Sequence, residues 1–155
     1  MTPSSPDSLQ EVTGDTLVLF HFEDIPVPRN SLGTVDWYLS GAVSRLAVDG
    51  KFTGALGSAV LFHPAGKFRV EKILVLGLGP RAAVDAHTLQ AAARHLRGLL
   101  DNLHARDIRI VLPDPLPVPP HEAMELFSTT FPFSKEQRAD SPRIRFLTSQ
   151  GDKTP

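Results

Sequence analysis

Hydrophobic and polar positions along this chain switch repeatedly between the period of a strand and that of a helix. A continuous aliphatic run at residues 73–76 ends in Gly77 and Gly79, which is typical of a strand buried on both faces of a sheet. Residues 85–104 then repeat apolar positions at helical spacing, and a second aliphatic run follows at residues 108–112. A strand, a helix and another strand in this order form a crossover unit, so the pattern predicts a partly parallel sheet covered by helices.

The same reasoning places further elements on both sides of this unit. Strands are expected at residues 16–22, from about Phe68 to Gly79 after a turn at residues 64–66, and at 143–148. A kinked or paired strand segment, interrupted by Gly54 and Gly57, is expected at residues 51–64, with residues 59–62 as its firmest part. One helix is expected to carry Val35, Leu39, Ala42, Val43 and Leu46 on one face and to stop near Asp49. Asp85 is expected to cap the helix of the crossover unit, and a short helix is expected to begin at Pro120 after a proline-rich connector. Together these elements predict an α/β domain.

Length and composition are compatible with one such domain. The chain has 155 residues, of which 41% are hydrophobic, and this suits a single globular unit with a real core. We expect the domain to occupy residues 14–149, with disordered tails at residues 1–13 and 150–155 because these ends contain little to bury.

Charge and cysteine content restrict the class of partner. The formal net charge is -1 and no long run of Lys or Arg occurs, so nucleic acid is an unlikely partner. The chain has no cysteine, which excludes disulfides and thiolate metal sites. No apolar segment has the length of a membrane span or the position of a signal peptide. We therefore expect a cytoplasmic protein with no membrane association.

Two loops carry the candidate binding residues. Residues 77–82, Gly-Leu-Gly-Pro-Arg-Ala, formally match a dinucleotide fingerprint in which glycines let a pyrophosphate approach the backbone amides. Pro80 removes one of those amides and the helix begins several residues later, so a structural turn is the favoured interpretation. Asp24 is a second candidate, because it follows the first strand where a ligand cleft would open, and Glu23 and Asp36 are its potential neighbours. Pro26 and Pro28 crowd its loop, so solvated loop carboxylates are the favoured interpretation.

Histidines are the remaining chemical candidates. The six histidines show neither His-x-His nor His-Glu-x-x-His spacing, so no metal site is predicted. Only His21 and His63 lie at or near the ends of core strands, where their side chains could come close together. Ordinary structural histidines are the favoured interpretation of this pair. Trp37 and Tyr38 are adjacent on a helix and cannot both face the core, so one of them is a candidate contact residue.

The order of these motifs resembles the amino-terminal domain of leucine aminopeptidases, the cytosolic two-metal exopeptidases. In that family a Phe-x-Gly-x-x-Gly stretch precedes a strand, and a hairpin leads to a strand ending in Gly-Leu-Gly; the corresponding residues are Phe52, Gly54, Gly57, Gly77 and Gly79. The resemblance covers about residues 15–148. It implies a three-layer, macrodomain-like fold with a mixed, mostly parallel sheet flanked by helices.

The resemblance also implies what this chain lacks. In the family the metal ligands and the catalytic Lys and Arg lie in a separate carboxyl-terminal domain with an Asn-Thr-Asp-Ala-Glu-Gly-Arg-Leu signature, and this sequence does not contain it. We therefore expect a non-catalytic interaction or regulatory domain without metal or cofactor, which forms a homo-oligomer or binds a protein partner. Two alternatives stay open. One is a nucleotide or ADP-ribose-type binding module that uses Gly77, Gly79 and Asp24 at the strand-end cleft. The other is the separated amino-terminal part of a split metallo-aminopeptidase, with the catalytic domain as its partner.

Overall fold

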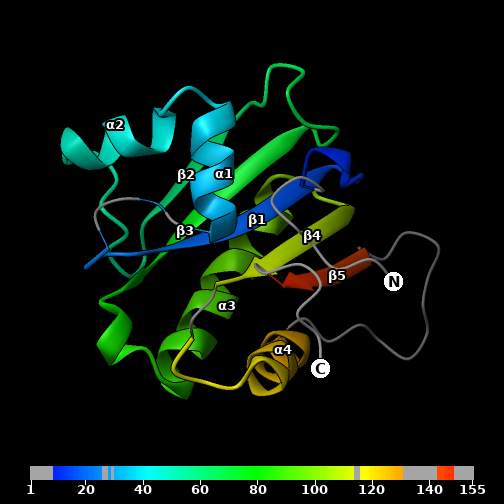
Figure 1. Cartoon of the computed structure of the whole chain (residues 1–155). Helices are drawn as coiled ribbons and strands as arrows, with labels where there is room; N and C mark the ends of the chain where they lie inside the picture. The colour runs from blue at the N-terminus through cyan, green and yellow to red at the C-terminus, as the bar shows by residue number, and fades with distance from the viewer. Residues whose placement is uncertain (1–8, 26–27, 29, 114–115, 131–142, 149–155) are drawn as a thin grey trace.

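The computed structural model describes residues 9–25, 28, 30–113, 116–130 and 143–148, and these build a five-stranded sheet between two layers of helices (Figure 1). The order across the sheet is β2-β3-β1-β4-β5. The strands are β1 (Thr16–Phe22), β2 (Ala59–Phe62), β3 (Lys72–Gly79), β4 (Asp107–Leu112) and β5 (Arg143–Thr148). The helices are α1 (Asn30–Tyr38), α2 (Ala42–Val48), α3 (Ala86–Asn102) and α4 (Pro120–Thr130), with short 3-10 helices η1 (Leu9–Glu11) and η2 (Arg81–Ala83).

The sheet is mixed and mostly parallel, as the sequence predicts. β1 pairs in parallel with β3 and with β4, and β4 pairs in parallel with β5, whereas β2 runs antiparallel to β3. The helix α3 makes the expected crossover from β3 to β4. Because β1 and β3 run in the same direction, their carboxyl ends lie side by side, with His21 opposite Gly77.

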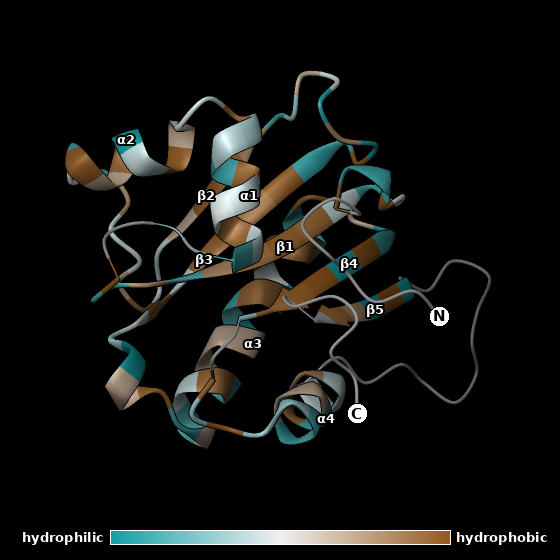
Figure 2. Cartoon of the chain, in the orientation of Figure 1, coloured by the Kyte–Doolittle hydropathy of each residue, from teal (hydrophilic) through white to brown (hydrophobic). Residues whose placement is uncertain are grey.

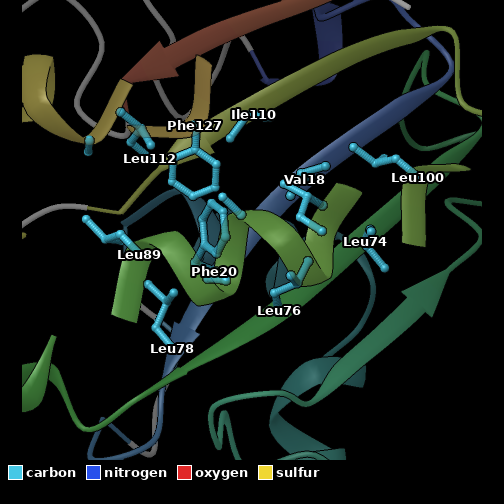
Figure 3. Packing of buried hydrophobic residues seen from close by; sticks show 14 of the residues in the cluster. Val18, Phe20, Leu74, Leu76, Leu78, Leu89, Leu100, Ile110, Leu112 and Phe127 are labelled. Carbon is cyan, nitrogen blue, oxygen red and sulfur yellow. The ribbon is translucent and has the colours of Figure 1, made fainter. Parts of the chain in front are cut away.

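Each face of the sheet supports its own hydrophobic core. Side chains of β1 alternate between the faces: Val18 and Phe20 join the core under α3 and α4, and Leu17 and Leu19 join the core under α1 and α2. The strands of this sheet are hydrophobic along most of their length (Figure 2). In the α3–α4 core the Phe20 and Phe127 rings lie 5.6 Å apart (Figure 3). Burial on both faces explains why β1 and β3 are continuous apolar runs in the sequence.

The helix expected to run continuously up to Asp49 is two helices. α1 ends at Tyr38 and α2 begins at Ala42. Ser40 between them has a φ of 59°, which a right-handed α-helix does not accommodate. The apolar positions keep a helical period across the break, because both helices cover the same core. The prediction of one helix was wrong here, since apolar period alone does not detect a change of direction.

Other predicted bounds hold closely. β1 and β5 have the expected residues, α3 begins directly after Asp85, and α4 begins at Pro120. Of the strand segment expected at residues 51–64, only the firmest part, Ala59–Phe62, is a strand. β3 begins at Lys72 rather than near Phe68. The segment expected as an amino-terminal tail contains η1, and its Leu9 is fully buried in the α1–α2 core, so the ordered chain begins before Gly14. The expected tail at residues 150–155 lies outside the described residues.

Candidate binding site at the carboxyl ends of the strands

A loop crosses directly over the carboxyl ends of β1 and β3. We call this loop, residues 52–58, the strap. It approaches β3 so closely that a Cβ atom on Gly77 would lie 2.1 Å from the carbonyl oxygen of Ala55 and 2.5 Å from the carbonyl carbon of Gly54. No side chain fits at residue 77, and this explains the glycine that ends the apolar run of β3.

The strap also uses the backbone amides of both candidate glycines. The Gly77 amide donates to the Ser58 carbonyl and the Gly79 amide donates to the Gly54 carbonyl, each at 2.9 Å. The Glu23 amide in turn donates to the Gly79 carbonyl at 2.9 Å. The two amides that the fingerprint would offer to a pyrophosphate therefore donate to protein carbonyls in this structure.

Asp24 lies at the same edge of the sheet but binds the protein itself. Its Oδ1 accepts a hydrogen bond of 2.9 Å from the amide of Arg81, the first residue of η2. This bond ties the turn after β1 to the turn after β3. The three candidate residues, Gly77, Gly79 and Asp24, are thus brought to one edge, and the described contacts of each are structural.

The amino terminus of α3 has the acidic cap that the sequence predicts. Asp85 accepts a hydrogen bond of 2.9 Å from the Thr88 amide. The bonds from Thr88 lower the pKa of the Asp85 carboxyl, because they stabilise its charged form. A carboxylate therefore already occupies the helix end where a dinucleotide phosphate would bind.

His21 is the buried polar group of this edge. Its side chain is 2% exposed, its ring centroid lies 5.9 Å from that of Phe52, and its Nε2 has no hydrogen-bond partner among the described residues. Burial lowers the pKa of His21, and the negative charge of Asp36 opposes that shift. No local pattern in the sequence indicates that the strap covers this imidazole.

His21 and His63 do not converge, in agreement with the favoured interpretation of ordinary structural histidines. His63 is exposed and follows β2, whose Phe62 pairs with Ile73, four residues before the Gly77 that pairs with His21. Ile73 and Gly77 are four residues apart along β3, which is roughly 13 Å, so the two histidines lie at different levels of the sheet. Within the described ranges, no three His, Asp or Glu side chains are grouped as metal ligands would be.

Asp36 does not join Asp24 in an acidic cluster. Its side chain lies between α1 and α2, where Oδ1 accepts from the Ser44 amide at 3.0 Å and Oδ2 accepts from the Ser44 hydroxyl at 2.5 Å. Asp24 and Glu23 are exposed in the turn after β1. The favoured interpretation, solvated loop carboxylates, holds for Glu23 and Asp24, whereas Asp36 is buried and is used to begin α2.

A surface hollow lies between the start of α3 and α4. It has a volume of about 320 Å³ and is lined by Ala86, Glu122, Glu125, Leu126 and Thr129. Four of these residues belong to one face of α4, at helical spacing. Neither loop that the sequence singled out contributes to it.

Comparison with known proteins decides the family. The profile of the cytosol aminopeptidase family, N-terminal domain, matches residues 14–125, which is more than half of the chain. The chain belongs to the cytosol aminopeptidase family. The probable cytosol aminopeptidase of Geobacter sp. strain M21 is 36% identical over 110 residues, which cover 71% of this chain and 22% of that protein. The chain thus spans about a fifth of the length of this family member, in the region of its N-terminal domain.

Solved structures show the same fold. A mutant of tomato leucine aminopeptidase, from the same family, superposes with a TM-score of 0.67 at 17% identity, over 88% of this chain and 30% of that one. The Trypanosoma brucei macrodomain in complex with ADP-ribose superposes with a TM-score of 0.67 at 13% identity, over 96% of this chain and 62% of that one. The macrodomain-like fold expected from the resemblance is confirmed. In the described part of the chain, no helix combines the length and apolar character needed to cross a membrane.

Proposed function

We propose that this chain is a non-catalytic association domain, and that it self-associates through the side of the molecule formed by α1, α2 and β2. The observation that carries the proposal is the distribution of exposed apolar side chains. Of the five large hydrophobic side chains exposed in the described residues, Trp37, Val48, Leu56 and Leu61 belong to residues 37–61, and only Met124 lies elsewhere. Trp37 is on α1 and Val48 is on α2, and these helices cover the same face of the sheet, whereas Leu61 lies on the opposite face of β2, beside Leu74 of the α3–α4 core. Exposed apolar side chains on neighbouring helices are typical of a protein interface.

Trp37 is the strongest candidate contact residue. Its side chain is 75% exposed, whereas the neighbouring Tyr38 is half-buried and packs its ring 5.7 Å from that of Phe68. The sequence predicts that one of these two aromatic residues is exposed, and this is confirmed. An exposed tryptophan offers a large apolar area to a partner at a low cost in side-chain entropy.

β2 offers a second element for association. It is one of the two edge strands of the described sheet, and its four residues, Ala-Val-Leu-Phe, carry no charge. Exposed edges without charged side chains readily pair with another strand. A second copy of the chain is the occupant we favour, because a net charge of -1 opposes such pairing only weakly.

Sedimentation velocity over a range of protein concentrations tests this proposal. The wild-type chain is expected to sediment as a dimer or larger assembly, and the double variant Trp37→Ser with Val48→Ser is expected to sediment as a monomer at the same concentrations. Met124→Ser is the matched control, because Met124 is also exposed but lies on α4. A wild-type chain that stays monomeric at all concentrations contradicts self-association.

A second candidate rests on the extent of the family match. Since the chain corresponds to the N-terminal domain and to 22% of the Geobacter relative, it is a candidate partner for a separately encoded metallo-aminopeptidase domain. Peptide hydrolysis measured with that domain alone and with this chain added is the test. An increase in rate supports the assignment, and an unchanged rate with no complex in sedimentation contradicts it.

Ligand binding at Gly77, Gly79 and Asp24 is a third candidate, and the fold shared with a macrodomain that holds ADP-ribose favours it. The strap opposes it, because it uses both glycine amides. Calorimetric titration with ADP-ribose distinguishes the two views. Saturable heat that is lost in Asp24→Ala supports the site, and no heat at high ligand concentration contradicts it.

A further inference from the structure

The strap is a short loop held between two firmer elements. At its start the amides of Lys51 and Phe52 donate to the carbonyl of Leu46 in α2, at 2.9 and 3.2 Å, and at its end β2 begins with Ala59. Between these anchors, the bonds from the strap to β3 are those from the Gly77 and Gly79 amides. Gly54 and Gly57 within the strap have φ values of 92° and 87°, so they provide two points at which the loop can turn. Phe52 anchors the start of the strap in the α1–α2 core, whereas Leu56 and Gly57 are exposed. Exposed loop segments open locally at a lower free energy than the sheet beneath them.

His21 lies directly under the strap. A Cβ atom on Gly54 would lie 2.7 Å from His21 Cδ2, and the imidazole packs against the Phe52 ring. Nε2 is next to Cδ2 in the imidazole, so the atom without a hydrogen-bond partner is at the covered edge of the ring. A neutral imidazole fits this apolar cover. A protonated one would leave an N–H donor without an acceptor or water while the strap is closed.

The charged groups around His21 are few. From α1, Asp36 faces it with a carboxylate, but that carboxylate accepts its hydrogen bonds from Ser44. The strap has no ionisable side chain, and the residue paired with His21 on β3 is Gly77. The charged residues at the end of α2 and at the start of the strap, Arg45, Asp49 and Lys51, are exposed.

The direction of the pKa shift agrees with this geometry. Burial lowers the pKa of His21 in the closed structure by more than Asp36 raises it. An imidazole released into water would regain the ordinary histidine pKa of about 6.5. The open form therefore binds more protons than the closed form between these two values, and the closed form loses stability as the pH falls below about 6.5.

We propose that residues 52–58 form a pH-sensitive strap, in which protonation of His21 releases the loop from the carboxyl ends of β1 and β3. The release breaks the bonds to the Ser58 and Gly54 carbonyls and frees the amides of Gly77 and Gly79. It leaves the sheet intact, because β3 remains paired with β1 along residues 72–76. The strap includes Leu56, one of the exposed apolar side chains named for self-association, so the test below measures the strap by amide exchange and not by assembly.

Amide hydrogen exchange, measured by NMR on the whole chain between about pH 7.5 and pH 5.5, tests the proposal directly. The rates at Gly77 and Gly79 are compared with those in His21→Gln at the same pH, so that the intrinsic exchange rate of each amide cancels. The ratio of the wild-type exchange rate to the His21→Gln exchange rate is expected to rise several-fold as the pH falls. Amides of residues 108–110 in β4 report global unfolding and are expected to keep their protection. His63→Gln is the matched control, because it removes an exposed histidine and leaves His21 in place.

Three outcomes would overturn the proposal. They are constant protection of Gly77 and Gly79 in the wild type over this pH range, simultaneous loss of protection in β4, and the same pH response in His21→Gln as in the wild type. If His21→Gln does not fold, the ring-proton shifts of His21 in the wild type decide the matter. Their titration is expected below the ordinary histidine pKa and to coincide with the loss of protection, and a titration at the ordinary value would contradict the proposal.

Discussion

Asp36 in α1 accepts two hydrogen bonds from Ser44 in α2, one from the amide and one from the hydroxyl. Ser44 is the third residue of α2, so its amide is one of the donors that have no partner within the helix. A residue eight positions earlier thus replaces a local cap, since Gly41 before α2 has no side chain to supply one. This bond fixes α2 at its angle to α1.

Replacing Asp36 by Ala is expected to destabilise the chain by about 1–3 kcal/mol, because the Ser44 amide and hydroxyl lose their acceptor in a half-buried place. Urea denaturation followed by circular dichroism measures the change. Asp49→Ala, at the exposed end of α2, is the control and is expected to cost no more than about 0.5 kcal/mol. Equal losses in both variants would mean that the Asp36–Ser44 bonds add nothing.

Replacing Gly77 by Ala is expected to cost at least about 2 kcal/mol, because the new methyl group would collide with the strap backbone 2.1 Å away. Gly98→Ala is the matched control. Gly98 lies within α3 with open space around its Cβ position, so alanine there is expected to stabilise the chain by about 0.5–1 kcal/mol. The two midpoints of urea denaturation should move in opposite directions, and a shift of the same sign would refute the close approach.

Replacing Phe127 by Ala is expected to cost about 3–5 kcal/mol, because its ring is fully buried between Phe20 and Phe146 at centroid distances of 5.6 and 6.2 Å. Met124→Ala, three residues earlier on α4, removes a partly exposed side chain and is expected to cost less than about 1 kcal/mol. Thermal denaturation of both variants compares them. A small effect at Phe127 would place α4 away from the sheet.

The cap of α3 is expected to weaken in acid. The hydrogen bonds from Thr88 lower the pKa of Asp85 in the folded chain, so its stabilising effect is present above the ordinary aspartate pKa of about 3.9 and is lost as the pH falls through the lowered value. The stability difference between wild type and Asp85→Ala should therefore shrink between about pH 6 and pH 2.5. Asp85→Asn is the control, since Asn caps a helix without titrating. A difference that does not change with pH would contradict the assigned cap.

Trp37 provides an internal probe of association, because it is the only tryptophan in the chain. In dilute solution its emission is expected to be that of a water-exposed indole and to be quenched readily by acrylamide, since its side chain is 75% exposed. At higher concentration the emission should shift to shorter wavelength and quenching should fall as the ring becomes covered. Unchanged emission and quenching across concentrations at which sedimentation detects assemblies would place Trp37 outside the interface.

The sequence by itself determined the strands, α3 and its cap, and the α/β class. These features depend on neighbouring residues: β1 is buried at every position and β3 at every position after Lys72, so both strands are mostly apolar, and Asp85 lies three residues before the amide that it binds. The glycines of Phe-x-Gly-x-x-Gly and Gly-Leu-Gly are visible in the sequence, and they are the residues that the close contact between the strap and β3 requires.

Only the tertiary structure decided which groups meet. Gly77 and Ala55 are 22 positions apart in the chain, and His21 and Gly54 are 33 positions apart. The hydrophobic periodicity within one segment therefore cannot predict their contacts. The same holds for the break between α1 and α2, which depends on a carboxylate eight residues before the amide that it binds. Periodicity records how each segment faces the core, whereas the strand-end site depends on backbone atoms that the sheet brings together from distant segments.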